Sequence, residues 1–186
     1  MPFTPYHMGP LLAVKLLAGR QVSFIVLGLS QVLIDVEVLV RMKLGSSHLH
    51  GISNTLTGAV AVGLLATAAG PPTVRLTHGL WNAAGPPEAL RLPPRISWRT
   101  AAISAFIGTF SHILLDAIMH ADAQPFAPLS PANPLLRAVG VGTLHDACLA
   151  IGAVAAVGLA GRWIAVRLLA RRATDAGRSG GGSISG

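Results

Sequence analysis

Long apolar segments separated by short polar loops dominate this sequence and restrict the fold that it can adopt. Four segments, residues 22–40, 52–69, 100–119 and 139–160, reach or approach the roughly 20 apolar residues that a helix needs to cross a bilayer. Only 11% of the 186 residues are charged, against roughly 25% in a soluble domain. We therefore predict an all-α fold, a polytopic membrane helical bundle with four long transmembrane helices.

A shorter apolar segment, residues 8–18, precedes these four and contains Lys15. It is either a short, tilted fifth span or a helix that lies in the membrane interface. Residues 70–99 and 122–134 are rich in proline and are predicted to be loops. Residues 1–172 are then a single transmembrane domain, and residues 173–186, which end in a glycine-rich run, are predicted to form a disordered tail.

The distribution of Lys and Arg predicts the topology. Ten of the 14 lie on one side of the predicted spans, namely Arg20, four arginines in residues 70–99 and five after residue 160. Three lie in the other two loops, and Lys15, inside residues 8–18, is the one left over. The positive-inside rule places the arginine-rich side and the C-terminus in the cytoplasm. Topology also explains the net charge of +7, so we expect no nucleic-acid partner.

Side chains that can ligate metals gather on the opposite, outer face in this topology. Six of the seven histidines and five of the seven acidic residues lie there if residues 8–18 bring His7 to that side. Charged groups near an apolar span are costly and usually mark a functional site. The clustered residues are His7, Asp35, Glu37, His48, His50, His112, Asp116, His120, Asp122, His145 and Asp146.

The strongest local pattern is the stripe formed by His112, Asp116 and His120 at intervals of four residues on one predicted helix. Imidazole and carboxylate groups are ligands for zinc and similar divalent ions. His112 and Asp116 are about 6 Å apart along the axis and can share an ion, whereas His120 is about 12 Å from His112. Asp116 can therefore bridge two ions, as carboxylates do in two-metal hydrolytic sites. The alternative is a polar stripe that forms hydrogen bonds between helices.

Other segments supply further candidates. His7, Asp35, His50, His112, Asp116 and His145 are the predicted metal ligands, with a proton-relay role left open for His145. His120, Asp122 and Glu37 are the candidates for the general base or for holding a ligand histidine in its tautomer. For Glu37, contact with headgroups or water is the alternative, and His48 and His78 are not assigned to the site.

Several short motifs together resemble the YdjM-type family of inner-membrane proteins classed as metal-dependent hydrolases. The resemblance spans most of residues 1–150 and rests on residues 2–10, 31–37, 49–55, 110–116 and 120–122. It implies a bacterial inner-membrane protein. Asn54 stands where the family pattern has a second histidine, and an amide is a poorer zinc ligand, so a pseudo-enzyme is an alternative. The order of ligands also resembles, distantly, that of the zinc-dependent phospholipase C group.

These observations predict a metal-dependent hydrolase with one or two divalent ions, most simply Zn²⁺, at the outer leaflet. Its expected partners are membrane lipid and a small-molecule or lipid substrate with a phosphoester or ester bond. A transporter for ions or protons is the first alternative, but the inner halves of residues 52–69 and 139–160 are almost purely apolar. A non-catalytic membrane scaffold that uses the basic loops is the second alternative.

Overall fold

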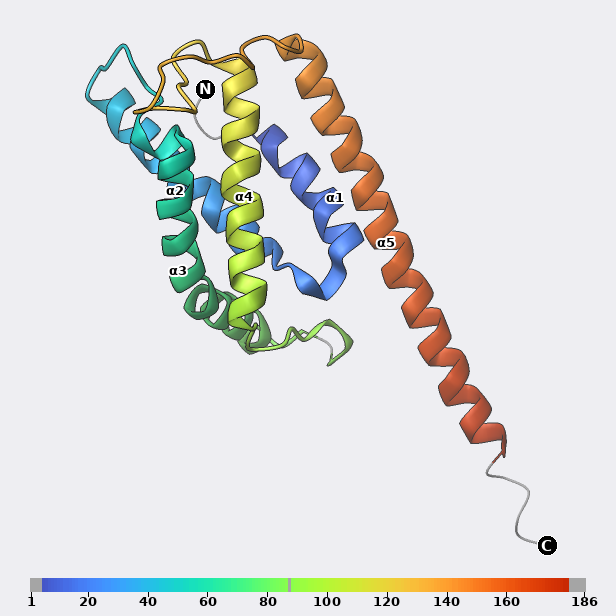
Figure 1. Cartoon of the computed structure of the whole chain (residues 1–186). Helices are drawn as coiled ribbons and strands as arrows, with labels where there is room; N and C mark the ends of the chain where they lie inside the picture. Colours follow the sequence, from blue (N-terminus) through green and yellow to red (C-terminus); the bar gives the residue numbers. More distant parts are fainter. Residues whose placement is uncertain (1–4, 87, 181–186) are drawn as a thin grey trace, which may run out of the picture.

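The computed structural model describes residues 5–86 and 88–180, and this part of the chain is helical without a strand. Figure 1 shows the arrangement. The principal helices are α1 (Met8–Ala18), α2 (Phe24–Lys43), α3 (Leu56–Ala83), α4 (Trp98–Met119) and α5 (Val141–Gly180). Short 3-10 turns η1 (Pro5–His7), η2 (Gly19–Gln21), η3 (Ile52–Asn54) and η4 (Glu88–Leu90) lie between or before them. The predicted all-α fold is confirmed.

Within the described residues, three helices are long and apolar enough to cross a membrane: α3, α4 and residues Val141–Leu169 of α5. The predicted count of four is not confirmed. Any membrane-length stretch of α2 contains the three charged residues Asp35, Glu37 and Arg41. Helix α1, with 11 residues, is about 16 Å long and covers roughly half of the hydrocarbon thickness. The three apolar helices are compatible with a multi-pass membrane protein.

Two segments differ from the sequence-based expectation. Helix α3 continues to Ala83 through Pro71 and Pro72, although residues 70–99 were expected to be a loop. Proline fixes φ at a helical value, and two missing hydrogen bonds bend a helix without ending it; α3 changes direction in its lower part (Figure 1). Helix α5 continues to Gly180, so residues 173–180, which were expected to begin the tail, extend the helix. Residues 181–186 of that tail lie outside the described part.

Close packing of α2, α3 and α4 positions the site. A Cβ atom at Gly108 of α4 would collide with the Ser30 hydroxyl of α2, so the two helices pack in direct contact there. Ile34, Ala59 and Ile113 form a buried cluster between the three helices just below the site. Helices α2 and α4 end, and α1, α3 and α5 begin, at one end of the molecule, which is the upper end in Figure 1.

Candidate metal centre

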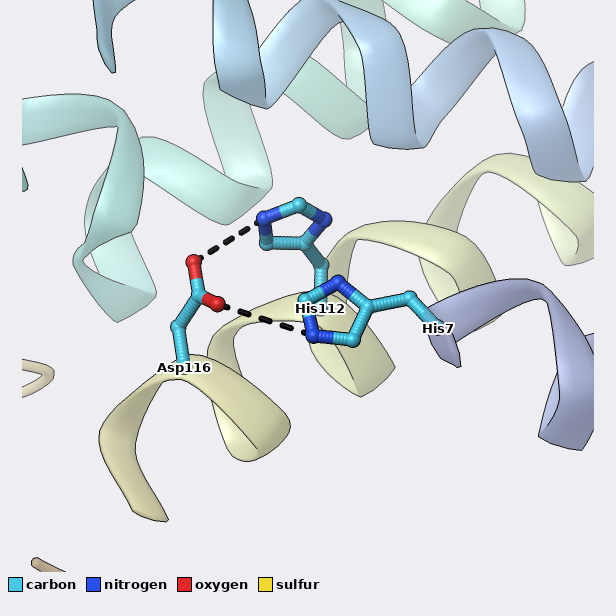
Figure 2. Close-up of side chains that lie close together, drawn as sticks. All are labelled: His7, His112 and Asp116. Carbon is cyan, nitrogen blue, oxygen red and sulfur yellow. Dashed lines mark ion pairs between the residues drawn. The ribbon is translucent and has the colours of Figure 1, made fainter. Parts of the chain in front are cut away.

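Asp116, in the last turn of α4, lies at the centre of a cluster of four imidazoles. Its carboxylate oxygens are 2.9 Å from Nε2 of His112, 3.7 Å from Nε2 of His7 and of His120, and 3.8 Å from Nε2 of His50. Figure 2 shows the carboxylate between His7 and His112. His7 meets His112 edge to face, with ring centroids 4.7 Å apart, and His50 stacks on His120 at 4.2 Å. One carboxylate thus faces two pairs of histidines.

The cluster contains two triads with the spacing that a metal ion requires. His7, His112 and Asp116 form one triad, and His50, Asp116 and His120 form the other. In each triad the potential ligand atoms lie within 4.8 Å of one another. Asp35 of α2 adds a second carboxylate to the first triad, since its Oδ1 is 3.4 Å from Nε2 of His112. The geometry can accommodate one ion, or two ions with Asp116 between them.

Several nitrogens of this cluster are buried without a hydrogen bond. Both ring nitrogens of His7 and Nε2 of His112 have no such partner among the described residues, and the side chains are only 4% and 1% exposed. The nearby Asp116 oxygens are close enough for ion pairing but are not in hydrogen-bond geometry. Buried polar atoms without partners are rare because they cost roughly 1–3 kcal/mol each. A bound cation would satisfy the nitrogens that face Asp116.

A hydrogen-bond chain fixes the tautomer of His112. The Gln31 amide nitrogen donates to the carbonyl of Gly108 at 2.7 Å, so the amide oxygen is the atom that faces Nδ1 of His112, also at 2.7 Å. An oxygen can only accept, and Nδ1 must therefore carry the proton. In the neutral form of His112 the lone pair is then on Nε2, as a metal ligand requires, whereas in the protonated form Nε2 forms an ion pair with Asp116 at 2.9 Å.

Asp122 fixes the tautomer of His50. Its Oδ1 accepts from Nδ1 of His50 at 2.7 Å, and its Oδ2 accepts from the backbone N–H groups of Leu49 and His50 at 2.8 and 3.1 Å. These hydrogen bonds outweigh desolvation and hold the pKa of Asp122 well below its usual value. A permanently ionised carboxylate behind an imidazole is the usual arrangement of histidines that bind metals.

Burial keeps His7 and His120 neutral. It lowers the pKa of His7 to about 4, with a further contribution from neighbouring His112. Burial also lowers the pKa of His120, which is the most exposed imidazole of the two triads at 24%. Neutral imidazoles can act as ligands or accept a proton, whereas protonated ones can do neither.

A family model described as a domain of unknown function, DUF4184, matches residues 1–129. The chain belongs to this family. No curated protein and no solved structure matches the chain. The DUF4184 region contains both triads together with Asp35 and Asp122, whereas α5 and His145 lie outside it. The family has no assigned activity, so the hydrolase that the YdjM-type resemblance implies is not shown by this membership.

Three histidines of the DUF4184 protein lie apart from the triads. His145 at the start of α5 stacks on Tyr6 with ring centroids 4.2 Å apart, so it supports the neighbour of His7. His48 lies in the loop before η3, and its carbonyl accepts from Ser46 Oγ at 2.9 Å. His78 bonds the Pro93 carbonyl at 2.6 Å at the opposite end of the molecule.

Glu37, predicted as a candidate base, is engaged elsewhere. Its carboxylate accepts from Arg41 Nε at 2.9 Å and from the backbone N–H groups of Ile52 and Ser53 at 3.2 and 2.7 Å. Glu37 therefore anchors η3 to α2 and belongs to neither triad. It fixes the segment that follows His50.

Sequence reasoning missed two residues that complete the site. The bond of Gln31 to His112 cannot be predicted unless the packing of α2 on α4 is known. Asn133 donates to the carbonyls of Ala117 and Ala123 at 2.8 and 3.1 Å, which ties the proline-rich loop to the end of α4. A polar residue within an apolar span was the available signal for Gln31, and nothing in the pattern distinguished Asn133.

Proposed function

We propose that this protein is a membrane-embedded, metal-dependent hydrolase that holds one or two divalent ions, most simply Zn²⁺, on Asp116 and its four histidines. The observation that carries the proposal is the position of Asp116, which two triads of ligand atoms share. The fixed tautomers of His112 and His50 support it, because each leaves a lone pair on the nitrogen that faces Asp116.

The donor set suits zinc. Imidazole nitrogen and carboxylate oxygen are its common ligands, and three protein ligands per ion leave a position open for water or substrate. When bound, Zn²⁺ lowers the pKa of a water molecule to about 7 and polarises a phosphoryl or carbonyl oxygen. Asp35 and Asp116 supply the negative charge that compensates the ion inside the bundle.

His120 is the group best placed to move a proton. Asp122 is committed to His50 and the backbone, and Glu37 to Arg41 and η3, so neither carboxylate is available as the base. His120 is neutral and reaches the surface of the site. We assign it either as the fifth ligand residue or as the acceptor of the proton of the attacking water.

The site end of the bundle favours a substrate at the membrane surface. The apolar spans α3 and α5 begin at this end and α4 finishes there, so the cluster lies close to headgroup level. The arginine distribution supports the outer face as the location of this end. A lipid-type phosphoester or ester in the outer leaflet, or a small ester from outside, is the substrate class that we propose.

Metal analysis of the purified protein tests the centre. After equilibration with Zn²⁺ and removal of excess metal, we expect about one or two ions per chain. Asp116→Asn should lose most of this metal, whereas His78→Gln, which removes a histidine far from the site, should retain it. A wild-type protein without metal, together with an Asp116→Asn variant that behaves like it, would refute the metal centre.

Activity is tested separately with a panel of phosphoesters and carboxylic esters, including phospholipids in vesicles. Hydrolysis that a chelator abolishes and Zn²⁺ restores would support the hydrolase. Metal binding without hydrolysis of any substrate in the panel would favour a pseudo-enzyme, in keeping with Asn54.

The described helices offer no conduit that would favour transport. Below the site, the buried hydroxyls of Ser30 and Ser104 donate to the carbonyls of Leu27 and Thr100 at 2.7 and 2.6 Å in their own helices. Both hydroxyls therefore have backbone partners, and Leu27 is buried in an apolar cluster with Leu11 and Val22. Ion flux into liposomes that persists in the Asp116→Asn variant would show that transport is independent of the site.

A further inference from the structure

Helix α5 is attached to the bundle along one side only. It packs on α1 and η1, and only 6% of its apolar span is buried within the chain. At the contact, Gly9 lies against the Cys148 carbonyl and Gly152, and Leu16 lies against Gly158. Figure 1 shows α5 beside α1 and diverging from the other helices below it. Most of the surface of α5 is therefore available to lipid.

An apolar groove of about 330 Å³ runs between α1 and α5. Its lining consists of small and aliphatic side chains: Ala13, Leu16 and Leu17 of α1, and Ala150, Ile151, Val154 and Ala155 of α5. Val154 on its rim is 72% exposed and Leu17 is 85% exposed. In a bilayer such a groove is in contact with hydrocarbon, and its walls match a lipid acyl chain.

Two cations lie at the lower end of this groove. Lys15 Nζ donates to the carbonyls of Gly19 and Val22 at 2.7 Å each, and Arg162 Nη1 donates to the carbonyl of Leu16 at 3.4 Å. Leu16 also lines the groove, which places Arg162 next to its end. Within the described residues neither cation has a carboxylate within 4.0 Å, so neutral carbonyls are their partners.

Both cations retain donors for an anion. An ammonium group has three N–H donors and a guanidinium group five, and the bonds above use two and one of them. From Val141 to Arg162 α5 rises about 31 Å, which is one hydrocarbon thickness. Arg162 therefore lies on the side of the span away from the candidate metal centre, where its long side chain can extend toward the headgroups of the opposite leaflet.

We propose that the α1–α5 groove and its cationic end bind one anionic phospholipid. An acyl chain occupies the groove between residues 13–17 and 150–155, and the phosphate pairs with Arg162 and Lys15. The lipid supplies the negative charge that the chain itself lacks there and ties α5 to α1. The proposal is independent of the metal centre and of any hydrolysis.

The test compares lipid retention by protein purified from vesicles of three parts phosphatidylcholine and one part phosphatidylglycerol. Native mass spectrometry should show one retained phosphatidylglycerol on the wild type. Arg162→Gln should retain roughly fivefold less, the effect expected for one cation at an anionic membrane surface. Arg167→Gln removes the same charge from a side chain that lies over the Trp163 ring at 4.2 Å, and should retain the lipid.

A second variant tests the groove without changing charge. Val154→Trp fills the rim from the lipid side and should displace the lipid, and its fold can be checked by helical circular dichroism and thermal melting. Equal loss in Arg162→Gln and Arg167→Gln would show a general surface effect and overturn the proposal. Full retention in Arg162→Gln and Val154→Trp, or complete displacement of the lipid by inorganic phosphate alone, would also overturn it.

Discussion

Proton positions on the histidines decide what the site can bind. His112 and His50 both have Nδ1 engaged by a side-chain oxygen, from Gln31 and Asp122 respectively, and both direct Nε2 toward Asp116. The two oxygens are themselves fixed by backbone groups. The imidazoles are thus oriented before any ion binds, which reduces the free-energy cost of forming the centre.

Replacing Asp122 tests this orientation at a residue that does not touch the proposed ion. Asp122→Asn removes the charge behind His50 and weakens its bonds to the backbone of residues 49–50. We expect metal affinity to fall by about 10- to 100-fold. Competition with a fluorescent chelator measures the change. Asp146→Asn removes a carboxylate at the start of α5, at the same end of the molecule, and should keep wild-type affinity. Equal affinity in the two variants would contradict the role of Asp122.

Acid should destabilise the metal-free protein through His7. In the folded state its pKa is lowered from 6.5 to about 4, so between these values the unfolded chain binds the proton and the folded chain does not. Stability therefore falls as pH decreases from 6.5 toward 4. In chelator-treated protein, the melting temperature of His7→Gln should fall less over this range than that of the wild type. His78→Gln should retain the wild-type slope, and an unchanged slope in His7→Gln would contradict this explanation.

The sequence predicted the central residues from helix periodicity and their partners only as candidates on the same face of the membrane. The spacing of His112, Asp116 and His120 is a property of one helix, so periodicity alone predicted that Asp116 would lie between the other two. The approach of His7 and His50 depends on how η1 and the loop before η3 fold onto α4. The predicted topology put these residues on one face without giving their contacts, and for the same reason it also included His145 and Glu37, which contact Tyr6 and Ser53.

At the scale of the helices, close contact between α2 and α4 sets the depth of the site. Gly108 allows the contact because a Cβ atom there would meet the Ser30 hydroxyl and lie 3.0 Å from the Leu27 carbonyl. The Gly108 carbonyl also accepts from Gln31, the residue that orients His112. One glycine therefore links helix packing to the tautomer of a proposed ligand.

Gly108→Ala should push α2 and α4 apart and, at the same time, disturb the site. We expect a loss of about 1–3 kcal/mol in stability, as for other overpacked cores, and weaker metal binding. Gly79→Ala is the matched control, because it is also a helical glycine but has no atom within 4 Å of an added Cβ. It should be neutral or slightly stabilising. Thermal melting and metal titration of both variants measure the two effects, and a Gly108→Ala protein as stable as Gly79→Ala would refute the packing argument.

Helix boundaries were harder to predict than helix positions. Apolar length correctly located α3, α4 and α5, because burying apolar surface in hydrocarbon is the dominant local signal. It stopped α3 too early at Pro71, since the hydrogen bonds that two prolines remove are outweighed by packing such as that of Val74 in the buried cluster with Val26. Local propensity cannot measure that tertiary contribution.

For the whole molecule, the two ends have opposite chemistry. One end gathers the triads around Asp116, and the other carries Lys15, Arg162 and most of the remaining arginines. The sequence predicted this polarity because alternation of spans fixes which loops share a side. The orientation of the molecule is a separate prediction, which rests on the number of Lys and Arg residues at each end.

Labelling of single cysteines tests this orientation. In a Cys148→Ala background, Leu129→Cys lies in the loop after α4, where Leu129 is 92% exposed, and Ala84→Cys lies at the other end, directly after α3. A membrane-impermeant maleimide should label position 129 in intact bacterial cells and position 84 only after permeabilisation. The reason is that the arginine-rich end resists translocation and remains at the anionic cytoplasmic leaflet. The reverse pattern would place the metal centre inside the cell, and the proposed substrate would then have to come from the cytoplasmic leaflet.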